Sequence, residues 1–85
     1  MRKIIFTPSA FKEYNDWIND DFEIVQKIIL LLRDIQNDPF RGLGKPEPLK
    51  GDYSGYWSRR ITITHRLVYR VSNDSIEIIK CKDHY

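Results

Sequence analysis

The residues best suited to chemistry lie in the second half of the chain: Glu47 between Pro46 and Pro48, Arg66, and His84. A carboxylate can remove the proton from a ribose 2′-hydroxyl, an imidazole can protonate the departing 5′-oxygen, and an arginine can bind two phosphate oxygens at once. The two prolines stiffen the backbone around Glu47 and leave its carboxylate free. Metal-free cleavage of RNA needs this set of groups, although any basic sheet also carries such residues.

Charge is distributed unevenly along the chain. The 85 residues have a net charge of +2, but residues 1–40 hold five basic and seven acidic side chains, whereas residues 41–85 hold nine and five. The first part is therefore net −2 and the second net +4. An anionic partner is expected to bind the second part.

Length and composition limit the class of protein. A chain of 85 residues and 10.2 kDa predicts one domain, residues 1–85, with a thin core that a second subunit would help to stabilise. The single cysteine, Cys81, excludes an internal disulfide framework, and two histidines are too few for a Cys/His zinc cluster. Neither a signal peptide nor an apolar run of about 20 residues is evident, so we expect a cytoplasmic protein that binds no membrane.

Two helices are expected in the first half of the chain. Lys3 to Phe6 reads as a short strand, and Thr7 can cap a helix that starts at Pro8 and runs to about Asn19. A second helix is expected from about Asp21 to Asn37. Apolar residues with helical spacing predict the buried faces, namely Phe11, Tyr14, Trp17 and Ile18 in the first helix and Phe22, Ile24, Val25, Ile28, Ile29, Leu31, Leu32 and Ile35 in the second. Leu30 falls outside this stripe and is either a stray exposed leucine or a contact with another chain.

The second half is expected to form strands after a long loop. Phe40 to Tyr53 shows no periodicity and predicts an irregular loop. Strands are expected at residues 56–61, 65–71 and 76–82, with a turn at 72–75. The order β-α-α-β-β-β predicts an α+β fold, an antiparallel sheet with a helical hairpin packed on one face.

Alternation along these strands predicts which side chains face away from the helices. Leu67 and Tyr69 are expected to pack on the helices, with Trp57 and Ile61 from the strand before. The outward set comprises Tyr56, Ser58, Arg60, Arg66, Arg70 and, by one reading of the last strand, Lys80, Lys82 and His84. Arg59 falls in the inner register, where it is either a salt-bridge partner or a phosphate contact.

Three further residues have simpler interpretations. His65 shares its register with Leu67 and is expected to be a hydrogen-bonded structural residue. Cys81 is expected to be a small buried side chain, because no activating base lies at a recognisable spacing. Asp83 would raise the pKa of His84 if it lay beside that imidazole, but strict alternation points it away.

Several motifs in order resemble the YoeB-type toxins of the RelE/ParE superfamily of bacterial toxin–antitoxin modules. The resemblance rests on Lys45-Pro-Glu-Pro-Leu-Lys50, Ser54-Gly-Tyr-Trp-Ser-Arg-Arg-Ile61, His65-Arg-Leu-Val-Tyr69 and the final His84-Tyr85. It covers essentially the whole chain, since the length and the early helical hairpin also fit. Thr62-Ile-Thr64 departs from the pattern, because related toxins often carry acidic residues there.

The resemblance implies a function and partners. Members of the family are ribosome-dependent endoribonucleases that cut mRNA in the ribosomal A site and stop translation. They pair with a YefM-type antitoxin and are often dimers. No metal or other cofactor is expected.

The resemblance also implies roles for six residues. Glu47 is the expected general base, His84 the general acid and Arg66 the group that stabilises the transition state. The residues expected to bind substrate are Lys50, Arg60 and Tyr85.

Two other functions remain open. A ParE-like toxin would inhibit gyrase by binding and would need no acid–base pair. A non-catalytic module would bind RNA or a partner with an affinity that falls as salt rises.

Overall fold

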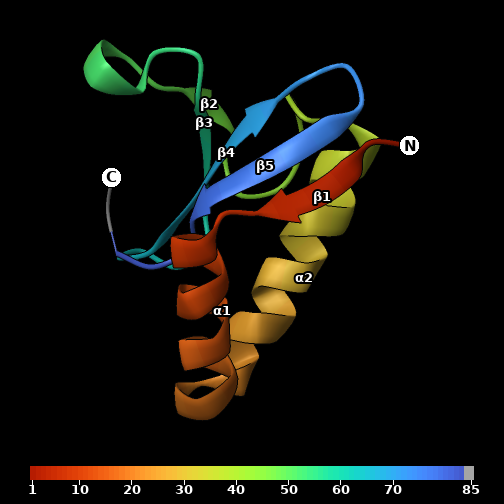
Figure 1. Ribbon diagram of the computed structural model, residues 1–85. Helices are drawn as coiled ribbons and strands as arrows, with labels where there is room; N and C mark the ends of the chain where they lie inside the picture. Colours follow the sequence, from red (N-terminus) through yellow and green to blue (C-terminus); the bar gives the residue numbers. More distant parts are fainter. Residues whose placement is uncertain (84–85) are drawn as a thin grey trace.

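A computed structural model describes residues 1–83 as two layers, with both helices against one face of a five-stranded sheet (Figure 1). The elements in chain order are β1 (Lys3–Phe6), α1 (Pro8–Asp20), α2 (Phe22–Asn37), β2 (Glu47–Pro48), the 3₁₀ turn η1 (Gly51–Tyr53), β3 (Trp57–Arg60), β4 (Arg66–Val71) and β5 (Ser75–Lys80). The α+β class and the helical hairpin are as predicted. In the described part of the chain, neither helix has the length and apolar character needed to span a membrane.

Side-chain caps define the helix starts. The Thr7 hydroxyl accepts a hydrogen bond from the Ala10 N–H at 3.2 Å, and Asp21 accepts one from the Glu23 N–H at 3.2 Å. Both bonds satisfy backbone donors that have no partner within the first turn. The predicted helix boundaries are therefore confirmed to within one or two residues.

The buried helix faces are narrower than predicted. The core includes Trp17 of α1 and four residues of α2, which are Val25, Ile28, Leu31 and Ile35. Four residues expected in the core lie at the margins of the buried faces: Phe11, Ile18, Phe22 and Ile29 are 55%, 44%, 58% and 37% exposed. Leu30 is half exposed, as predicted.

The sheet is mixed rather than purely antiparallel. Its strand order is β1-β5-β4-β3-β2, and β1 runs parallel to β5, with Ile4 opposite Ile76. The prediction of a fully antiparallel sheet is wrong at this edge. After β1 the helical hairpin carries the chain to the opposite edge of the sheet, where β2 lies. All other strand pairs are antiparallel.

An irregularity in β5 changes which side chains face the helices. Tyr69 pairs with Ile78 and Val68 with Lys80, so the pairing skips Ile79. An extra residue of this kind reverses the alternation of every side chain after it. Cys81 is therefore buried in the core together with Ile78, although strict alternation would put them on opposite faces.

The stretch from Phe40 to Tyr53 contains two short elements, β2 and η1, so the prediction of an entirely irregular loop is wrong. β2 consists of Glu47 and Pro48 alone and pairs with β3. Proline disfavours helical backbone in the residue before it, and Pro48 thus favours the extended conformation of Glu47. The loop therefore presents Glu47 at an edge of the sheet.

Arg59 holds the first part of this loop in place. Its guanidinium is fully buried, forms an ion pair with Asp34 of α2, and donates to the Asp38, Arg41 and Leu43 carbonyls at 2.7, 3.0 and 3.1 Å. Of the two roles left open for Arg59, salt-bridge partner or phosphate contact, the structure shows the first. Buried guanidinium groups need this number of acceptors to offset the loss of water.

Candidate active site

Glu47, Arg60 and Arg66 lie on one face of the sheet, the face away from the helices. Glu47 of β2 is directly opposite Ser58 of β3, and Arg60 of β3 is directly opposite Arg66 of β4. Residues that face each other across strands point to the same side, and so do residues two apart along a strand. The sheet therefore gathers one carboxylate and two guanidinium groups on a single surface.

Sheet geometry sets the spacing between Glu47 and Arg66. They are two strands apart, about 10 Å across the sheet, and offset by two residues, about 7 Å along it. Backbones roughly 12 Å apart leave room for one phosphodiester between a glutamate and an arginine side chain, each several ångströms long. Glu47 is exposed, so its carboxylate is accessible to a ligand.

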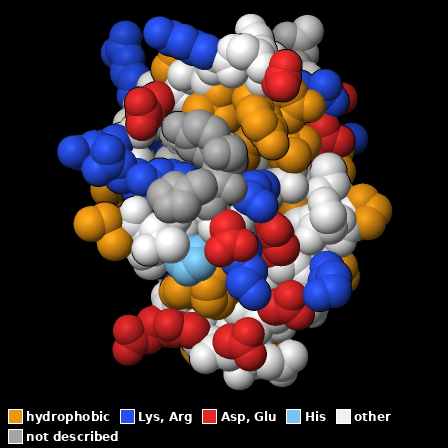
Figure 2. Space-filling view, turned by 90° about the vertical axis from the view of Figure 1, so that its left-hand side faces the viewer, with side chains coloured by type: hydrophobic (Ala, Val, Ile, Leu, Met, Phe, Trp, Pro, Cys, Tyr) orange, Lys and Arg blue, Asp and Glu red, His pale blue; other side chains and the backbone are white. Residues whose placement is uncertain are grey.

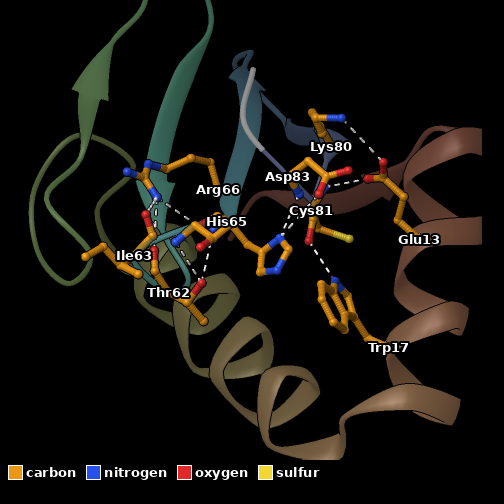
Figure 3. A network of polar contacts seen from close by, with 10 residues as sticks. Glu13, Trp17, Thr62, Ile63, His65, Arg66, Lys80, Cys81 and Asp83 are labelled. Atoms are coloured by element: carbon orange, nitrogen blue, oxygen red, sulfur yellow. Dashed lines mark hydrogen bonds and ion pairs between the residues drawn. The ribbon is translucent and has the colours of Figure 1, made fainter.

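Arg66 is aimed by the turn between β3 and β4. Its Nη1 donates to the carbonyl oxygens of Thr62, Ile63 and His65 at 3.0, 3.2 and 3.2 Å (Figure 3). Toward residues 1–83, Nη2 and Nε make no hydrogen bond, so these nitrogens are available to phosphate oxygens. The turn therefore fixes one end of the guanidinium and leaves the other for an anion.

Thr62 stabilises this turn. Its hydroxyl accepts hydrogen bonds from the Thr64 and His65 N–H groups at 3.1 and 3.0 Å. The sequence marks Thr62 only as part of a departure from the family pattern, although threonine hydroxyls commonly bond to backbone N–H groups that follow them in a turn. Thr62 thus supports Arg66 indirectly, through the carbonyls of the turn.

The last described residue lies beside Arg66. The Arg66 N–H donates to the Asp83 carbonyl at 3.0 Å, which continues the pairing of β4 with the chain that follows β5. His84 and Tyr85, the expected general acid and a residue expected to bind substrate, lie outside the described residues. Asp83, the residue before them, is hydrogen-bonded to the Arg66 backbone.

Lys50 and Arg60 are both exposed. Lys50 follows Leu49, whose side chain is buried and whose N–H donates to the Tyr56 carbonyl at 2.9 Å. The Arg60 N–H donates to the Gly44 carbonyl at 2.7 Å, which ties β3 to the loop before β2. Backbone contacts thus hold both basic residues near the edge formed by β2 and β3.

Three residues of the predicted outward set make contacts that the sequence did not indicate. Lys80 pairs with Val68, in the outward row of Ser58, but its ammonium lies 3.6 Å from the Glu13 carboxylate of α1. The Lys82 ammonium lies 5.3 Å from the centre of the Trp17 ring. Ser58 faces outward, as predicted, but is only 1% exposed. It is a small side chain in a row whose cross-strand neighbours, Glu47 and Val68, are both larger.

His65 and Cys81 have the structural roles predicted for them. His65 Nδ1 accepts a hydrogen bond from the Asp83 N–H at 2.8 Å, and its ring packs edge-on against Trp17 at 4.8 Å between centroids. Cys81 is fully buried, and this burial raises the pKa of its thiol to about 12. A thiol that stays protonated at neutral pH is a poor nucleophile.

Charged side chains of both signs are spread over the surface. Figure 2 shows Lys and Arg side chains mainly in the upper and middle parts of one face, with Asp and Glu side chains among them and again at the lower end, toward the turn that joins the helices. Among residues 1–83, no three carboxylate, imidazole or thiol groups come together as metal ligands. The described groups of the site are thus one carboxylate and a set of cations.

Comparison of the sequence with known families and proteins gives one consistent result. Residues 6–85 match the model of the YoeB-like toxin of bacterial type II toxin-antitoxin system. The chain is 49% identical over 83 residues to Toxin YoeB of Streptomyces coelicolor, a match that covers 98% of this chain and 99% of the relative.

Solved structures agree with the sequence comparison. A YoeB/ParE toxin from Agrobacterium tumefaciens superposes with a TM-score of 0.95 at 50% identity, covering 98% of this chain and 99% of the other. A YoeB-YefM complex and a YoeB dimer, both from Staphylococcus aureus, give TM-scores of 0.91 and 0.93 at 43% and 45% identity. They cover 100% and 99% of this chain, and 99% and 98% of theirs.

Proposed function

Because the chain belongs to the YoeB-like toxins of bacterial type II toxin–antitoxin systems, we propose that it is a ribosome-dependent endoribonuclease. It cuts mRNA in the ribosomal A site and thereby stops translation. The observation that carries the proposal is the shared face of Glu47, Arg60 and Arg66, with the chain before His84 paired to Arg66.

The chemistry follows from the types of these groups. Glu47 removes the proton from the ribose 2′-hydroxyl, which then attacks the neighbouring phosphorus and breaks its bond to the 5′-oxygen. His84 donates a proton to that departing oxygen. Arg66 binds the phosphate oxygens whose negative charge increases in the transition state, and the carbonyls that hold Nη1 reduce the reorganisation this requires.

The remaining site residues bind substrate. Lys50 and Arg60 contact phosphates that flank the cleaved bond, and Tyr85 helps to position the message. Phosphate contacts of this kind hold the backbone in place without reading the base sequence. The exposed positions of Lys50 and Arg60 support these roles.

Mapping the ends of mRNA fragments in a reconstituted translation reaction tests the proposal. The parent protein is expected to cut the message in the A site, and the variants Glu47→Gln, Arg66→Met and His84→Gln are each expected to cut at least about 100-fold more slowly. Glu77→Gln and Arg70→Gln are matched controls, because this ion pair lies on the same face of β4 and β5 outside the site. Both controls are expected to cut as the parent does.

The same experiment separates the other functions. Growth inhibition without any cut message would favour a toxin that acts by binding, such as a gyrase inhibitor. Salt-dependent binding without cleavage or toxicity would favour a non-catalytic RNA-binding module. Either result would overturn the nuclease proposal.

The proposal includes two partners. We expect a YefM-type antitoxin to bind and inhibit this chain, and a second copy to form a homodimer, in line with the complexes reported for the Staphylococcus aureus relatives. Co-purification with an antitoxin encoded beside this gene, followed by mass measurement in solution, checks both. A free toxin that stays monomeric at micromolar concentration would contradict the homodimer.

A further inference from the structure

The chain that leads to His84 is held by side chains that the reaction does not use. At Cys81, the backbone N–H donates to the Glu13 carboxylate at 2.7 Å, and the carbonyl accepts from Trp17 Nε1 at 2.9 Å (Figure 3). Both partners come from α1. The backbone at residue 81 is therefore fixed to the helical layer on both of its polar groups.

Asp83, two residues further on, is held in the same way from β4. Its N–H donates to His65 Nδ1 at 2.8 Å, and its carbonyl accepts from the Arg66 N–H at 3.0 Å. Asp83 has φ +63°, a left-handed conformation that residues other than glycine adopt rarely and that aspartate adopts more often than most. The two hydrogen bonds hold Asp83 in this conformation and thus fix the direction in which the chain leaves it.

His65 is itself held rigidly enough to serve as an anchor. The Thr62 hydroxyl binds its N–H, its carbonyl accepts from the Ile61 N–H at 3.0 Å, and the edge of its ring packs on Trp17. Trp17 in turn binds the Cys81 carbonyl, so the two aromatic rings form one unit under residues 81–83. Figure 3 shows this unit between α1 and the start of β4.

The hydrogen bond to Asp83 uses His65 Nδ1 as its acceptor, because a backbone N–H can only donate. An acceptor at the Nδ1 position is the property that the site needs. A ring without an acceptor would leave the exposed Asp83 N–H to water, and of the two hydrogen bonds that hold Asp83 only the one from the Arg66 N–H would remain.

We propose that His65 is a positioning residue for the reaction described above, acting through the backbone of Asp83. Its Nδ1 holds Asp83, the residue before the proposed general acid His84, in the left-handed conformation. This inference rests on the proposed nuclease function. It assigns to His65 a role different from that of an acid or base, because its Nδ1 binds the Asp83 N–H and its ring packs against Trp17.

Two variants separate the acceptor from the ring. His65→Phe keeps a ring against Trp17 and removes the acceptor. His65→Asn removes the ring and keeps an acceptor, since the asparagine Oδ1 and the histidine Nδ1 are both bonded to Cγ. A merely structural role for the ring predicts that His65→Phe is the milder change, whereas the positioning role predicts that His65→Asn is.

The first measurement is independent of cleavage. In the full-length parent protein labelled with ¹⁵N, NMR is expected to detect a through-hydrogen-bond coupling between the Asp83 amide nitrogen and His65 Nδ1. Its absence at neutral pH would overturn the inference. The same spectra, with urea unfolding curves, establish that both variants are folded.

The second measurement is the single-turnover rate of message cleavage at saturating toxin. His65→Phe is expected to lower this rate about 10- to 100-fold with unchanged ribosome binding, and His65→Asn to stay within about 3-fold of the parent. A His65→Phe variant that cuts as fast as the parent would overturn the positioning role. A parent that shows the coupling but cuts no message would instead overturn the proposed function, so the two failures are distinct.

Discussion

Arg59 and Asp34 join the middle of the sheet to the second helix through an ion pair whose guanidinium is fully buried. Arg59 Nε also donates to the Tyr69 hydroxyl at 3.1 Å, and that hydroxyl donates to the Pro39 carbonyl at 2.7 Å. These contacts fix residues 38–43, the first part of the loop that carries Glu47. The position of the expected general base therefore depends on a buried network on the opposite face of the sheet.

Replacing Arg59 is expected to destabilise the whole domain. Arg59→Met leaves the loop carbonyls and the Asp34 carboxylate without their donor and is expected to lower the free energy of unfolding by about 3–5 kcal/mol. Arg41→Met, an exposed change in the same loop, is expected to change it by less than about 0.5 kcal/mol. Urea unfolding followed by circular dichroism measures both, and equal effects would contradict the role given to Arg59.

Asp34 makes stability depend on pH in the acid range. Its hydrogen bond from the Leu43 N–H and its pairing with Arg59 lower the pKa of this carboxylate below its usual 3.8. A lowered folded-state pKa contributes stability that is present above pH 3.8 and is lost as pH falls through the folded-state value. Unfolding free energies from neutral pH down to about pH 3 are expected to fall less steeply for Asp34→Asn than for the parent. Asp16→Asn, which removes an exposed ion pair with Lys12, is the control. If the stability of this variant also fell less steeply with falling pH than that of the parent, the explanation would be contradicted.

Gly44 is expected to tolerate no side chain. It has φ +77°, and a Cβ atom there would lie 2.9 Å from the Arg60 carbonyl oxygen and 3.1 Å from a Leu31 methyl. Gly44→Ala is expected to cost about 2–4 kcal/mol of unfolding free energy from backbone strain and this clash together. Gly51→Ala is the matched control, since Gly51 has φ +65° but open space around it, and is expected to cost only about 1 kcal/mol. Similar losses in the two variants would show that the clash with Arg60 contributes nothing.

Cys81 is expected to resist thiol reagents in the folded protein. Burial in the core, strengthened by the charge of Glu13, raises the pKa of its thiol to about 12, so almost no thiolate exists at about pH 8. Alkylation by iodoacetamide followed by mass spectrometry is expected to be negligible in buffer and complete in urea. Rapid labelling in buffer would mean that the core around Cys81 opens readily.

Local features of the fold could be predicted because their causes are local. Thr7 and Asp21 cap the helices, and the spacing of Val25, Ile28 and Ile35 sets the buried face of α2. The antiparallel pairing of β3 with β4 follows from alternation and a short turn. Each of these features depends on residues that are close together in the sequence.

Other features depend on contacts between distant parts of the chain. The extra residue Ile79 reverses alternation in β5, and nothing in the sequence marks it. Glu13 and Trp17 bind the backbone of Cys81 across more than sixty residues, so no spacing could have indicated them. The roles expected of Glu47, Arg66 and His84 come from the family resemblance. That Glu47 and Arg66 lie on the same face of the sheet is shown by the strand register and could not be predicted from composition.

The parallel pairing of β1 with β5 has a consequence for the order of folding. Residue 3 pairs with residue 75, and β5 lies between β1 and β4 in the sheet, so the strand synthesised first has no neighbour until the fifth strand has been made. Such a non-local closure is slow compared with helix or hairpin formation. A growing chain thus carries the helical hairpin before its sheet is complete, and β1 gains its strand partner only after β5 has been made.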